Sequence, residues 1–445
     1  MPRRKKEEQP QEEIKKIKTP ALVRGMKDIL PSSEKHWSFI ERACRRVIED
    51  YSYKKMDTPV LEKFELFNHT LFKQNGVADK ETFNFLDKGE KLVLRPEATS
   101  SIARAYVAHN MSNQIPPVKV YYWGPMFRQG KPEDNNYRQF TQVGFEIIGD
   151  ASAAIDAELI ITAHYLLKNT LIETEVKLNS LGCVTCRPEY KKALTGFLKS
   201  KRTAVCADCR KNATRDPMKF LTCKNSKCVR LKEEMPQAVD WLCDECRNHL
   251  FRVLEYLDEL KISYRLDPFL LRTYDFYSKT VFEITTKVED EKEEPVVLAG
   301  GGRYDNLIEM VGGEPTPAAG FSLGLERVVN QMKTNRSEIP NPPSPDVFVA
   351  QLSEQARQKA FKYFEQLRHQ GFSTRANFSK SSLKAQLEQA KKVGAKLVLI
   401  FGQKEVVEGT VLLRDLESGI QEVINQDKIV KEVKKRLKEK YLKEN

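Results

Sequence analysis

The sequence predicts an α+β protein in three parts: a core with a mainly antiparallel sheet, a cysteine-rich insertion in that core, and a C-terminal α/β domain. Three observations support this fold class. Up to residue 333, predicted strands follow one another with few helices between them. Eight of the nine cysteines fall between Cys183 and Cys246. After several prolines near residue 340, strands and helices alternate, as is typical of an independent α/β domain.

The first part of the core is predicted to span residues 20–182. The segments Val118–Phe127 and Gln139–Ile148 are rich in aromatic and β-branched residues and flank a polar stretch, which predicts a hairpin with a long loop. The other expected elements are a helix from Glu34 to Tyr51, an extended segment at Met56–Val60, a strand at Leu92–Leu94, a helix through Ile102 and Tyr106, a helix capped by Asp150 or Ser152, and a strand at Val176–Leu181.

The core resumes over residues 247–333 after an insertion at 183–246. We expect a helix at Arg247–Leu260, strands at Val281–Thr285 and Val296–Ala299, and a turn at Gly300–Gly302. Residues 334–345 are predicted to be a linker, because they contain Pro340, Pro342, Pro343 and Pro345. Residues 346–445 are then expected to form strands at Val347–Ala350 and Lys396–Phe401, helices at Ser353–His369 and Ser381–Val393, one further strand and a final amphipathic helix.

Composition and charge limit the classes of function. With 445 residues the chain is long enough for about three domains. No apolar run approaches the ~18 residues of a membrane span, and the charged start lacks the apolar centre of a signal peptide, so we expect a cytoplasmic protein without a membrane partner. Residues 1–19, a predicted disordered tail, carry a net charge of +3 and residues 428–445 carry +5, out of +12 in total. The body is therefore mildly basic, which permits a nucleic-acid partner without requiring one.

The clustered cysteines form four pairs, of which three are C-x-x-C and one has four intervening residues. Without an export signal, such pairs favour a metal over disulfides, and they could close two structural zinc sites of four thiolates each. The pairs can be grouped in three ways, and a single site with leftover thiols, or none, is the alternative. The candidate ligands are Cys183, Cys186, Cys206, Cys209, Cys223, Cys228, Cys243 and Cys246.

Common nucleotide-binding signatures are absent. The sequence has neither a G-x-x-x-x-G-K-[ST] loop nor a G-x-G-x-x-G fingerprint after a strand. Any bound ATP must therefore be held by side chains, and arginine suits that task because its planar fork donates two hydrogen bonds and stays charged. Arg128, at the predicted end of the first hairpin strand, is a candidate.

Three segments in order resemble the motifs of the class II aminoacyl-tRNA synthetases. Pro59 is similar to motif 1; Tyr121–Arg128 together with Arg138–Glu146 resembles motif 2; and Gly320–Arg327 resembles motif 3. Within that class, two further segments resemble the histidine-specific motifs of the histidyl-tRNA synthetase family. They are Leu271–Tyr277, followed by Thr280–Glu283, and Ala299–Asp305. Arg95–Thr99 is similar to the loop of that family that binds the substrate amine, and the resemblance covers roughly residues 20–430.

The resemblance implies the fold, the reaction and the partners. It implies a class II synthetase core, an anticodon-binding C-terminal domain and a homodimer formed through motif 1. The implied reaction is ATP-dependent ligation of L-histidine to tRNA(His) through a histidyl-adenylate, which releases AMP and pyrophosphate, with Mg²⁺ accompanying ATP. Neither step needs a covalent enzyme intermediate, so positioning and charge stabilisation should supply most of the rate.

The same resemblance assigns roles to individual residues. Arg128 would hold the α-phosphate and the histidine carboxylate, Arg272 would be a second guanidinium on the α-phosphate, and Arg327 would hold the γ-phosphate. The predicted histidine-binding residues are Glu97, Thr99 and Gln142 for the ammonium group and Glu146 and Tyr277 for the imidazole, with Ala98, Arg128, Arg272 and Phe276 completing the set. The structural alternative makes Tyr277 a core aromatic residue and Glu146 a surface carboxylate.

The chain departs from the family pattern at two places. Many members have Arg-Gly-Leu-Asp-Tyr-Tyr where this chain has Arg272-Thr-Tyr-Asp-Phe-Tyr277, so Phe276 lacks a hydroxyl. Asn136 stands where many members have a basic residue in the motif 2 loop, which leaves Lys131 as a substitute for contacting the acceptor end of the RNA.

Three other functions are compatible with parts of the sequence. They are a non-catalytic paralogue that regulates histidine biosynthesis, a zinc-dependent RNA-binding protein, and a synthetase for glycine, proline or threonine. Retention of Arg128, Arg272 and Arg327 argues against the first, and the three motifs argue against the second.

Overall fold

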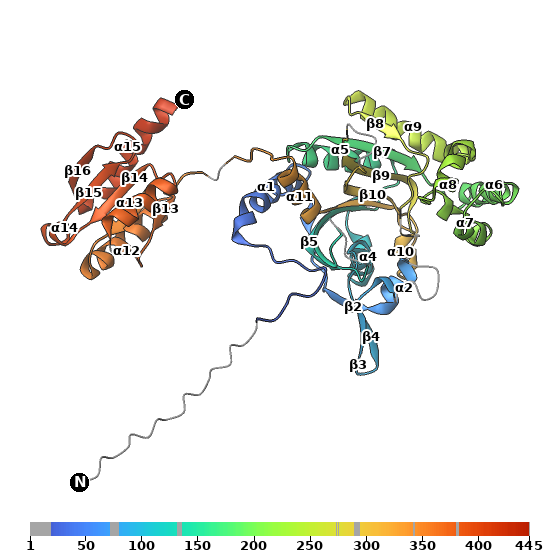
Figure 1. The fold of residues 1–445 in the computed structure, drawn as a ribbon, viewed down its shortest axis with the longest axis horizontal. Helices are drawn as coiled ribbons and strands as arrows, with labels where there is room; N and C mark the ends of the chain where they lie inside the picture. The colour runs from blue at the N-terminus through green and yellow to red at the C-terminus, as the bar shows by residue number, and fades with distance from the viewer. Residues whose placement is uncertain are drawn as a thin grey trace, which may run out of the picture. The chain divides into compact units, whose positions relative to one another are not determined.

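The computed structural model describes residues 19–71, 80–130, 136–272, 274, 276–288, 294–340, 343–379 and 382–444. The chain divides into two compact units, the first ending at Glu338 and the second beginning at Ile339 (Figure 1). No helix in these described ranges is both long and apolar enough to cross a membrane.

An eight-stranded mixed sheet forms the centre of the first unit. Its five inner pairings are antiparallel, whereas the outermost pair at each edge is parallel. The antiparallel centre agrees with the predicted fold class, and the parallel edges were not predicted. The strands, in spatial order, are β1 (Lys54–Lys55), β5 (Val118–Phe127), β6 (Gln139–Ile148), β11 (Ala318–Gly324), β10 (Val297–Arg303), β9 (Ser278–Thr286), β7 (Thr174–Ser180) and β8 (Tyr264–Leu266).

Helices cover both faces of this sheet. On one face, α5 (Ala153–Lys168) lies against β11, β7, β9 and β10, and it also packs on α1 (Glu34–Asp50) and α9 (Asp244–Glu259). On the other face, α4 (Thr99–Ala108) shares a hydrophobic cluster with Ile148 at the end of β6. Because side chains alternate along a strand, Gln142 and Glu146 face the same side as Ile148. Gln142 and Glu146 therefore lie on the face that α4 covers.

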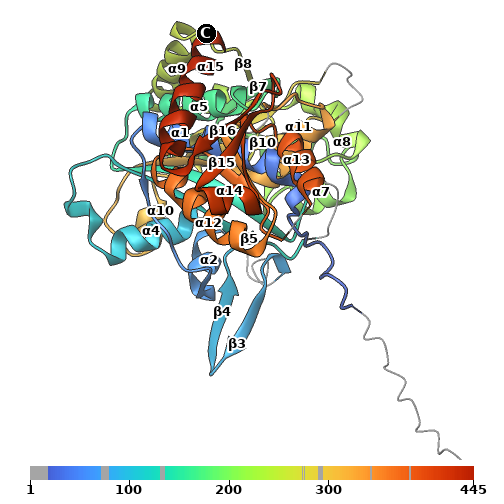
Figure 2. The same cartoon turned by 90° about the vertical axis from the view of Figure 1, so that its left-hand side faces the viewer.

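A separate three-stranded sheet projects from the first unit, as Figures 1 and 2 both show. Its strands are β2 (Leu61–Lys63), β4 (Glu90–Leu94) and β3 (Asn84–Asp87). The predicted extended segment Met56–Val60 is not itself a strand but connects β1 to β2. Pro59 lies within that connection, and it has no N–H to donate to a strand ladder.

The three glycines predicted to form a turn lie instead inside β10, and this prediction was wrong. Gly300, Gly301 and Gly302 pair with β9 on one side and with β11 on the other. A side chain at Gly301 would overlap the Gly320 carbonyl, and one at Gly300 would overlap the Arg272 guanidinium. The glycines are needed for close approach of neighbouring groups rather than for reversal of the chain.

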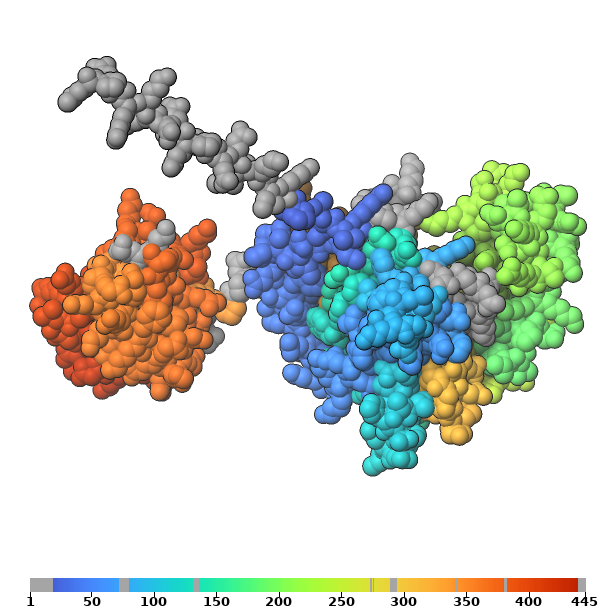
Figure 3. Space-filling view, turned by 90° about the horizontal axis from the view of Figure 1, so that it is seen from below, coloured from blue at the N-terminus to red at the C-terminus, as the bar shows by residue number. Residues whose placement is uncertain are grey.

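The cysteine-rich segment folds into short helices around its own hydrophobic cluster. Figure 3 shows its green side chains as a lobe at one end of the first unit. The helices are α6 (Cys186–Ser200), α7 (Ala207–Asn212) and α8 (Ser226–Leu231), with 3-10 turns at Pro217–Phe220, Lys232–Glu234 and Ala238–Trp241. The helix predicted from Arg247 begins earlier, at Asp244, because Cys243 occupies its N-cap position and two acidic residues favour its first turn.

The second unit is a five-stranded sheet with helices. Its strands, in spatial order, are β13 (Thr374–Ala376), β12 (Val347–Gln351), β14 (Leu397–Phe401), β15 (Thr410–Asp415) and β16 (Gln421–Asn425), and its helices are α12 (Glu354–His369), α13 (Leu383–Lys392), α14 (Gln403–Glu408) and α15 (Ile429–Glu444). The predicted βαβ pattern is present through β14. The β15–β16 hairpin was missed, because the side chains of β16 are mostly exposed and lack a buried apolar pattern.

Candidate active site

A cavity of about 250 Å³ brings three arginines together from distant parts of the sequence. Arg128 directly follows β5, Arg272 precedes β9, and Arg327 lies in α11 (Leu325–Thr334). Gln142 also lines this cavity, and so do two carboxylates, Glu283 and Glu326. The cavity thus combines three guanidinium groups with oxygen ligands on one face of the sheet.

Arg272 is oriented by Glu283, which stands across from Gly300 in the pairing of β9 with β10. Its Nη1 donates to Glu283 Oε1 at 2.7 Å, and its guanidinium lies 5.5 Å from the centre of the Tyr277 ring. Burial opposes the positive charge, but Tyr277 and Glu283 together raise the pKa of Arg272. Its Nε has no hydrogen-bond partner among the residues that the structure describes. Arg272 therefore stays charged and keeps a donor for an anion.

The other two arginines are also held at the rim of the cavity. Arg128 Nε donates to the Pro96 carbonyl at 3.1 Å, and its guanidinium lies 5.0 Å from the Phe140 ring. Arg327 Nη1 donates to the Val297 carbonyl at 3.2 Å. Burial, together with repulsion by Arg128 and Arg272, lowers the pKa of Arg327. Three cations that repel one another around one cavity favour a polyanionic ligand.

A buried polar cluster centred on Glu146 adjoins this cavity. Glu146 Oε1 accepts from Thr99 Oγ1 at 2.8 Å, and its Oε2 accepts from the Tyr304 hydroxyl. Burial raises the pKa of Glu146 to about 8, although these two hydrogen bonds act in the opposite direction. Gly320 lies opposite Glu146 in β11, and a side chain there would overlap the carboxylate. The surface-carboxylate alternative for Glu146 is therefore wrong.

Gln142 connects the polar cluster to the cavity. Its Oε1 accepts from the Tyr122 hydroxyl at 3.3 Å, and its Nε2 donates to Ser322 Oγ at 2.7 Å. Both partners are hydroxyls, which can donate or accept. The two contacts hold the Gln142 amide at the boundary between the cavity of the three arginines and the buried polar cluster.

Glu97 and Ala98 lie at the start of α4, directly after Pro96, whose carbonyl accepts from Arg128. The Glu97 carboxylate accepts from the Ser100 backbone N–H at 3.1 Å, and burial raises its pKa despite this bond. Ala98 occupies the N-cap position of α4 and is fully buried. Glu97 therefore offers a buried carboxylate at the N-terminus of a helix.

Phe276 and Tyr277 belong to a buried aromatic group. Their ring centres are 4.7 Å apart, and Tyr304 lies 5.6 Å from Phe276 and 6.3 Å from Tyr277. Tyr277 thus lies between Arg272 and the Glu146–Tyr304 pair. Phe276 also lines a second cavity of about 380 Å³, which it shares with Cys183 and Arg187.

The predicted site residues therefore fall into two neighbouring groups. Arg128, Gln142, Arg272 and Arg327 line the first cavity, together with Asn136. Five others are buried and do not line it: Glu97, Ala98, Glu146, Phe276 and Tyr277. Thr99 is half-buried, does not line it either, and donates to Glu146. Lys131 lies outside the described residues.

Sequence reasoning missed several partners of the predicted residues: Tyr122, Glu283, Tyr304 and Ser322. Two signals could have found some of them. Glu283 and Tyr304 lie within the segments that resemble the histidine-specific motifs. In addition, Gly300 pairs with the charged residue Glu283 across the sheet. A glycine in such a pair leaves space above it for another side chain, which here is that of Arg272.

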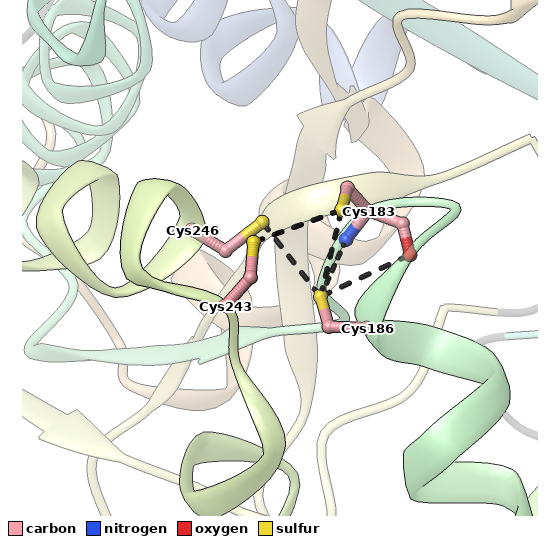
Figure 4. A group of neighbouring side chains, drawn as sticks. All are labelled: Cys183, Cys186, Cys243 and Cys246. Carbon is pink, nitrogen blue, oxygen red and sulfur yellow. Dashed lines mark hydrogen bonds between the residues drawn. The ribbon is translucent and has the colours of Figure 1, made fainter.

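Four cysteines from the two ends of the cysteine-rich segment form a first cluster, which we call the hinge cluster: Cys183, Cys186, Cys243 and Cys246. Figure 4 shows their sulfur atoms facing one another. The Sγ of Cys183 lies 3.6 Å from that of Cys186 and 3.9 Å from that of Cys243, and the Sγ atoms of Cys186 and Cys246 are 3.8 Å apart. Four thiolates at the usual Zn–S distance of about 2.3 Å would stand about 3.8 Å apart in a tetrahedron, so this geometry fits zinc.

The remaining four cysteines form a second cluster, which we call the lobe cluster: Cys206, Cys209, Cys223 and Cys228. The Cys206 and Cys223 sulfurs are 3.9 Å apart, and in each cluster all four sulfurs lie within 4.8 Å of one another. All eight cysteines are free thiols rather than disulfides. The structure therefore selects one of the three possible groupings of the four pairs. The first pair in the sequence, Cys183/Cys186, joins the last, Cys243/Cys246, and the two pairs between them join each other.

The fold and the site together define a class of enzyme. The sheet, antiparallel in its centre, carries a long hairpin whose first strand leads into Arg128. It also carries a strand–helix unit that presents Arg327, and arginines replace a glycine-rich phosphate loop. This combination is that of a class II aminoacyl-tRNA synthetase.

Comparisons with known proteins identify the family. Residues 25–328 match the model of the histidyl-tRNA synthetase family, and residues 346–436 match that of the anticodon binding domain. The chain is 39% identical to a histidine–tRNA ligase of Thermodesulfovibrio yellowstonii over 90% of its length and 95% of that relative. It is 37% identical to a histidine–tRNA ligase of Dehalococcoides mccartyi over 93% of its length and 99% of that relative.

A solved structure gives the same result. The apo histidyl-tRNA synthetase of S. aureus superposes with a TM-score of 0.77 at 31% identity, covering 94% of this chain and all of the other. The chain belongs to the histidyl-tRNA synthetase family. Its reaction is the ligation of histidine to tRNA(His), which uses ATP with Mg²⁺. Specificity for glycine, proline or threonine and the two non-catalytic functions are therefore set aside.

Proposed function

We propose that the cavity between Arg128, Arg272 and Arg327 is where histidine is activated by ATP. The convergence of three guanidinium groups on one cavity is the observation that carries this assignment. The histidine carboxylate attacks the α-phosphorus of ATP, and pyrophosphate leaves. Arg128 and Arg272 hold the α-phosphate from two directions, and Arg128 also holds the attacking carboxylate. Arg327 holds the γ-phosphate, and therefore the leaving group.

The arginines act by stabilising charge that develops as pyrophosphate leaves. They are preorganised by Pro96, Val297 and Glu283, so little reorganisation is needed during the reaction. Glu283 and Glu326 supply carboxylate oxygens in the same cavity, which suits the Mg²⁺ that accompanies ATP.

Histidine is bound at the boundary between the cavity and the buried polar cluster. Glu97, Thr99 and Gln142 bind the ammonium group. An ammonium group only donates hydrogen bonds, and these residues offer a carboxylate, a hydroxyl and an amide oxygen as acceptors. Glu146 and Tyr277 take the imidazole, and the contacts of Tyr304 with both residues support that pairing. Ala98 and Phe276 line the same pocket as small and apolar surfaces.

Exchange of labelled pyrophosphate into ATP tests the phosphate assignment. Arg327→Ala should raise the KM for ATP by about tenfold or more, while the KM for histidine changes little, because a charged hydrogen bond to the leaving group is lost. Arg368→Ala is the control, because that arginine is exposed on α12 in the other unit. An unchanged KM for ATP in Arg327→Ala would contradict the assignment. Exchange supported by another amino acid would contradict the histidine pocket.

We further propose that the hinge cluster and the lobe cluster each bind one structural zinc ion. Eight free thiols in two groups with tetrahedral spacing support this. Zinc bound at the hinge cluster would join the two ends of the cysteine-rich segment. Zinc bound at the lobe cluster would hold together the residues between those ends. Neither cluster lines the cavity that contains the arginines, so the role is structural rather than catalytic.

Elemental analysis of purified protein tests the metal proposal. We expect about two zinc ions per chain, and Cys246→Ser and Cys209→Ser should each lose about one, since four-coordinate structural sites need all four thiolates. Cys44→Ser is the control, because Cys44 is buried in α1 and belongs to neither cluster. Wild-type protein without zinc would exclude both sites.

We propose further features of organisation from the same resemblance. The core comprises residues 20–182 and 247–333, the insertion domain residues 183–246, the linker residues 334–345, and the anticodon-binding domain residues 346–445. The chain acts in the cytoplasm as a homodimer formed through the motif 1 region around Pro59. Sedimentation of the free protein tests the dimer, and a monomer at micromolar concentration would contradict it.

A further inference from the structure

The hinge cluster lies at the junction between the cysteine-rich segment and the histidine-specific segment. Cys183 and Cys186 follow β7, whereas Cys243 and Cys246 begin α9 (Figure 4). The two pairs are 60 residues apart in sequence, and their sulfurs meet at 3.8 and 3.9 Å. Whatever these sulfurs bind therefore joins two elements that both contact the start of β9.

The first pair contacts this segment through Arg187. The Arg187 backbone N–H donates to the Cys183 carbonyl at 3.0 Å, which makes Arg187 part of the same turn as the two thiols. Its side chain reaches the core: Nε donates to the Leu181 carbonyl at 3.4 Å, and Nη2 donates to the Tyr277 carbonyl. Arg187 therefore links the geometry of the cysteine turn directly to the backbone of Tyr277.

The backbone around the first pair makes a second connection. Leu181 N–H donates to the Lys279 carbonyl at 2.8 Å, and Lys279 N–H donates to the Gly182 carbonyl at 3.0 Å. Gly182 has a φ of +67°, and a side chain there would overlap the Cys186 sulfur. Because Gly182 has no side chain, its carbonyl can accept from Lys279 while the Cys186 thiol packs closely against its α-carbon.

The second pair contacts the same segment from α9. Glu245, between the two cysteines, accepts from Lys279 Nζ at 2.8 Å. Lys279 itself has a φ of +45°, which is a sparsely populated conformation for a residue with a side chain. Such a conformation needs surrounding contacts to hold it, and here both halves of the hinge cluster supply them.

We infer that metal binding at the hinge cluster positions Tyr277 for histidine recognition, with Arg187 as the positioning residue that transmits the geometry. This inference rests on the proposed roles of Tyr277 and of the zinc sites. Arg187 does not line the cavity that contains the three arginines. It sets the position of the Tyr277 backbone, and hence of the ring between Arg272 and Tyr304.

The lobe cluster provides a natural comparison. It lies in the hydrophobic cluster of the cysteine-rich segment, which packs against Phe269 and Leu271. Among the described residues, its cysteines make no backbone hydrogen bond to Tyr277–Lys279. Loss of its metal should loosen the lobe, whereas loss of the metal from the hinge cluster should change histidine binding.

Histidine-dependent pyrophosphate exchange, measured together with zinc content, tests the inference. Arg187→Ala should raise the KM for histidine about tenfold, the effect of losing a charged hydrogen bond that orients a binding residue. The KM for ATP, the kcat and the zinc content should change by less than about twofold, since Arg187 lies outside the cavity of the three arginines and is not one of the four candidate metal ligands. Arg187→Lys should recover only part of the loss, because an ammonium keeps the charge but lacks the planar fork with which the guanidinium reaches both carbonyls. Lys192→Ala, an exposed residue of the same helix, is the matched control.

A pair of ligand variants separates the two clusters. Cys186→Ser should lose about one zinc ion and raise the KM for histidine as Arg187→Ala does, and the double variant should add little, because both act through one connection. Cys228→Ser should also lose about one zinc ion while the KM for histidine stays within about twofold of the original value. Equal effects of the two cysteine variants, an unchanged KM in Arg187→Ala, or multiplying effects in the double variant would each overturn the inference. If wild-type protein shows no exchange with histidine, the proposed active site fails instead, and if it contains no zinc, the metal proposal fails.

Discussion

Arg272→Ala is expected to lower the rate of histidine-dependent pyrophosphate exchange by about 10²–10³-fold, the usual cost of removing one preorganised donor to a developing charge. Arg272 lies in the cavity with Arg128 and Arg327, its Nε has no partner within the described part of the chain, and it stays charged despite burial. Alanine would remove the second guanidinium from the α-phosphate while leaving the ATP γ-phosphate contact in place. The loss should therefore appear mainly in kcat.

The fold should survive this substitution. The partner carboxylate of Glu283 is 20% exposed, so it can be hydrated once Arg272 is absent. Circular dichroism and thermal unfolding check this point. Arg272→Lys keeps the charge but not the planar fork, and should recover only part of the rate. Arg265→Ala removes an exposed arginine from β8 and serves as the control. Exchange near the wild-type rate in Arg272→Ala would refute the role of this residue.

Glu146→Ala is expected to raise the KM for histidine by about 10²-fold, because both the imidazole and two protein hydroxyls lose their buried acceptor. The hydroxyls are those of Thr99 and Tyr304. Glu146→Gln keeps an acceptor oxygen of the same shape and should lose less. The KM for ATP should change little in either variant, since Glu146 does not line the cavity that contains the arginines. A histidine KM unaffected in both variants would exclude Glu146 from imidazole recognition.

The same carboxyl group predicts a dependence of stability on pH. Burial raises the pKa of Glu146 from its ordinary value of 4.5 to about 8. The folded protein therefore binds this proton more tightly than the unfolded chain does. The resulting stabilisation is complete below the unfolded pKa and is lost as pH rises through the folded pKa. Between these values, the free energy of unfolding should fall more steeply with pH for the wild type than for Glu146→Gln. Denaturant unfolding across that window measures both slopes, and parallel curves would contradict the shifted pKa.

Much of the fold could be predicted because its signals are local. The hairpin strands β5 and β6 have the predicted bounds, since ten-residue runs of β-formers around a polar loop have few alternatives. Helix α1 was likewise predicted, because Ile40, Cys44, Val47 and Ile48 recur at helical spacing and are all buried. The β15–β16 hairpin was missed because β16 contributes little to a core. The Gly300–Gly302 segment was misread because glycine marks both turns and close approaches.

The candidate site was likewise only partly predictable from the sequence. Motif order and arginine positions in the sequence were enough to indicate the family, and they predicted the three arginines that line one cavity in the structure. They did not identify Glu283 as the partner of Arg272, or Tyr304 as the partner of Glu146. Those pairs join residues on different strands or segments, and their contact depends on register across the sheet.

By itself, then, the sequence determined the family, the reaction, the hairpin with Arg128 and the presence of four cysteine pairs, because these depend on residue identity and short spacing. The tertiary structure alone decided which cysteine pairs join and placed Arg187 against the Tyr277 carbonyl. It also buried Glu146, which raises its pKa. The physical reason is that pairing and burial are set by contacts between segments far apart in the chain, and no local pattern of residues encodes those distances.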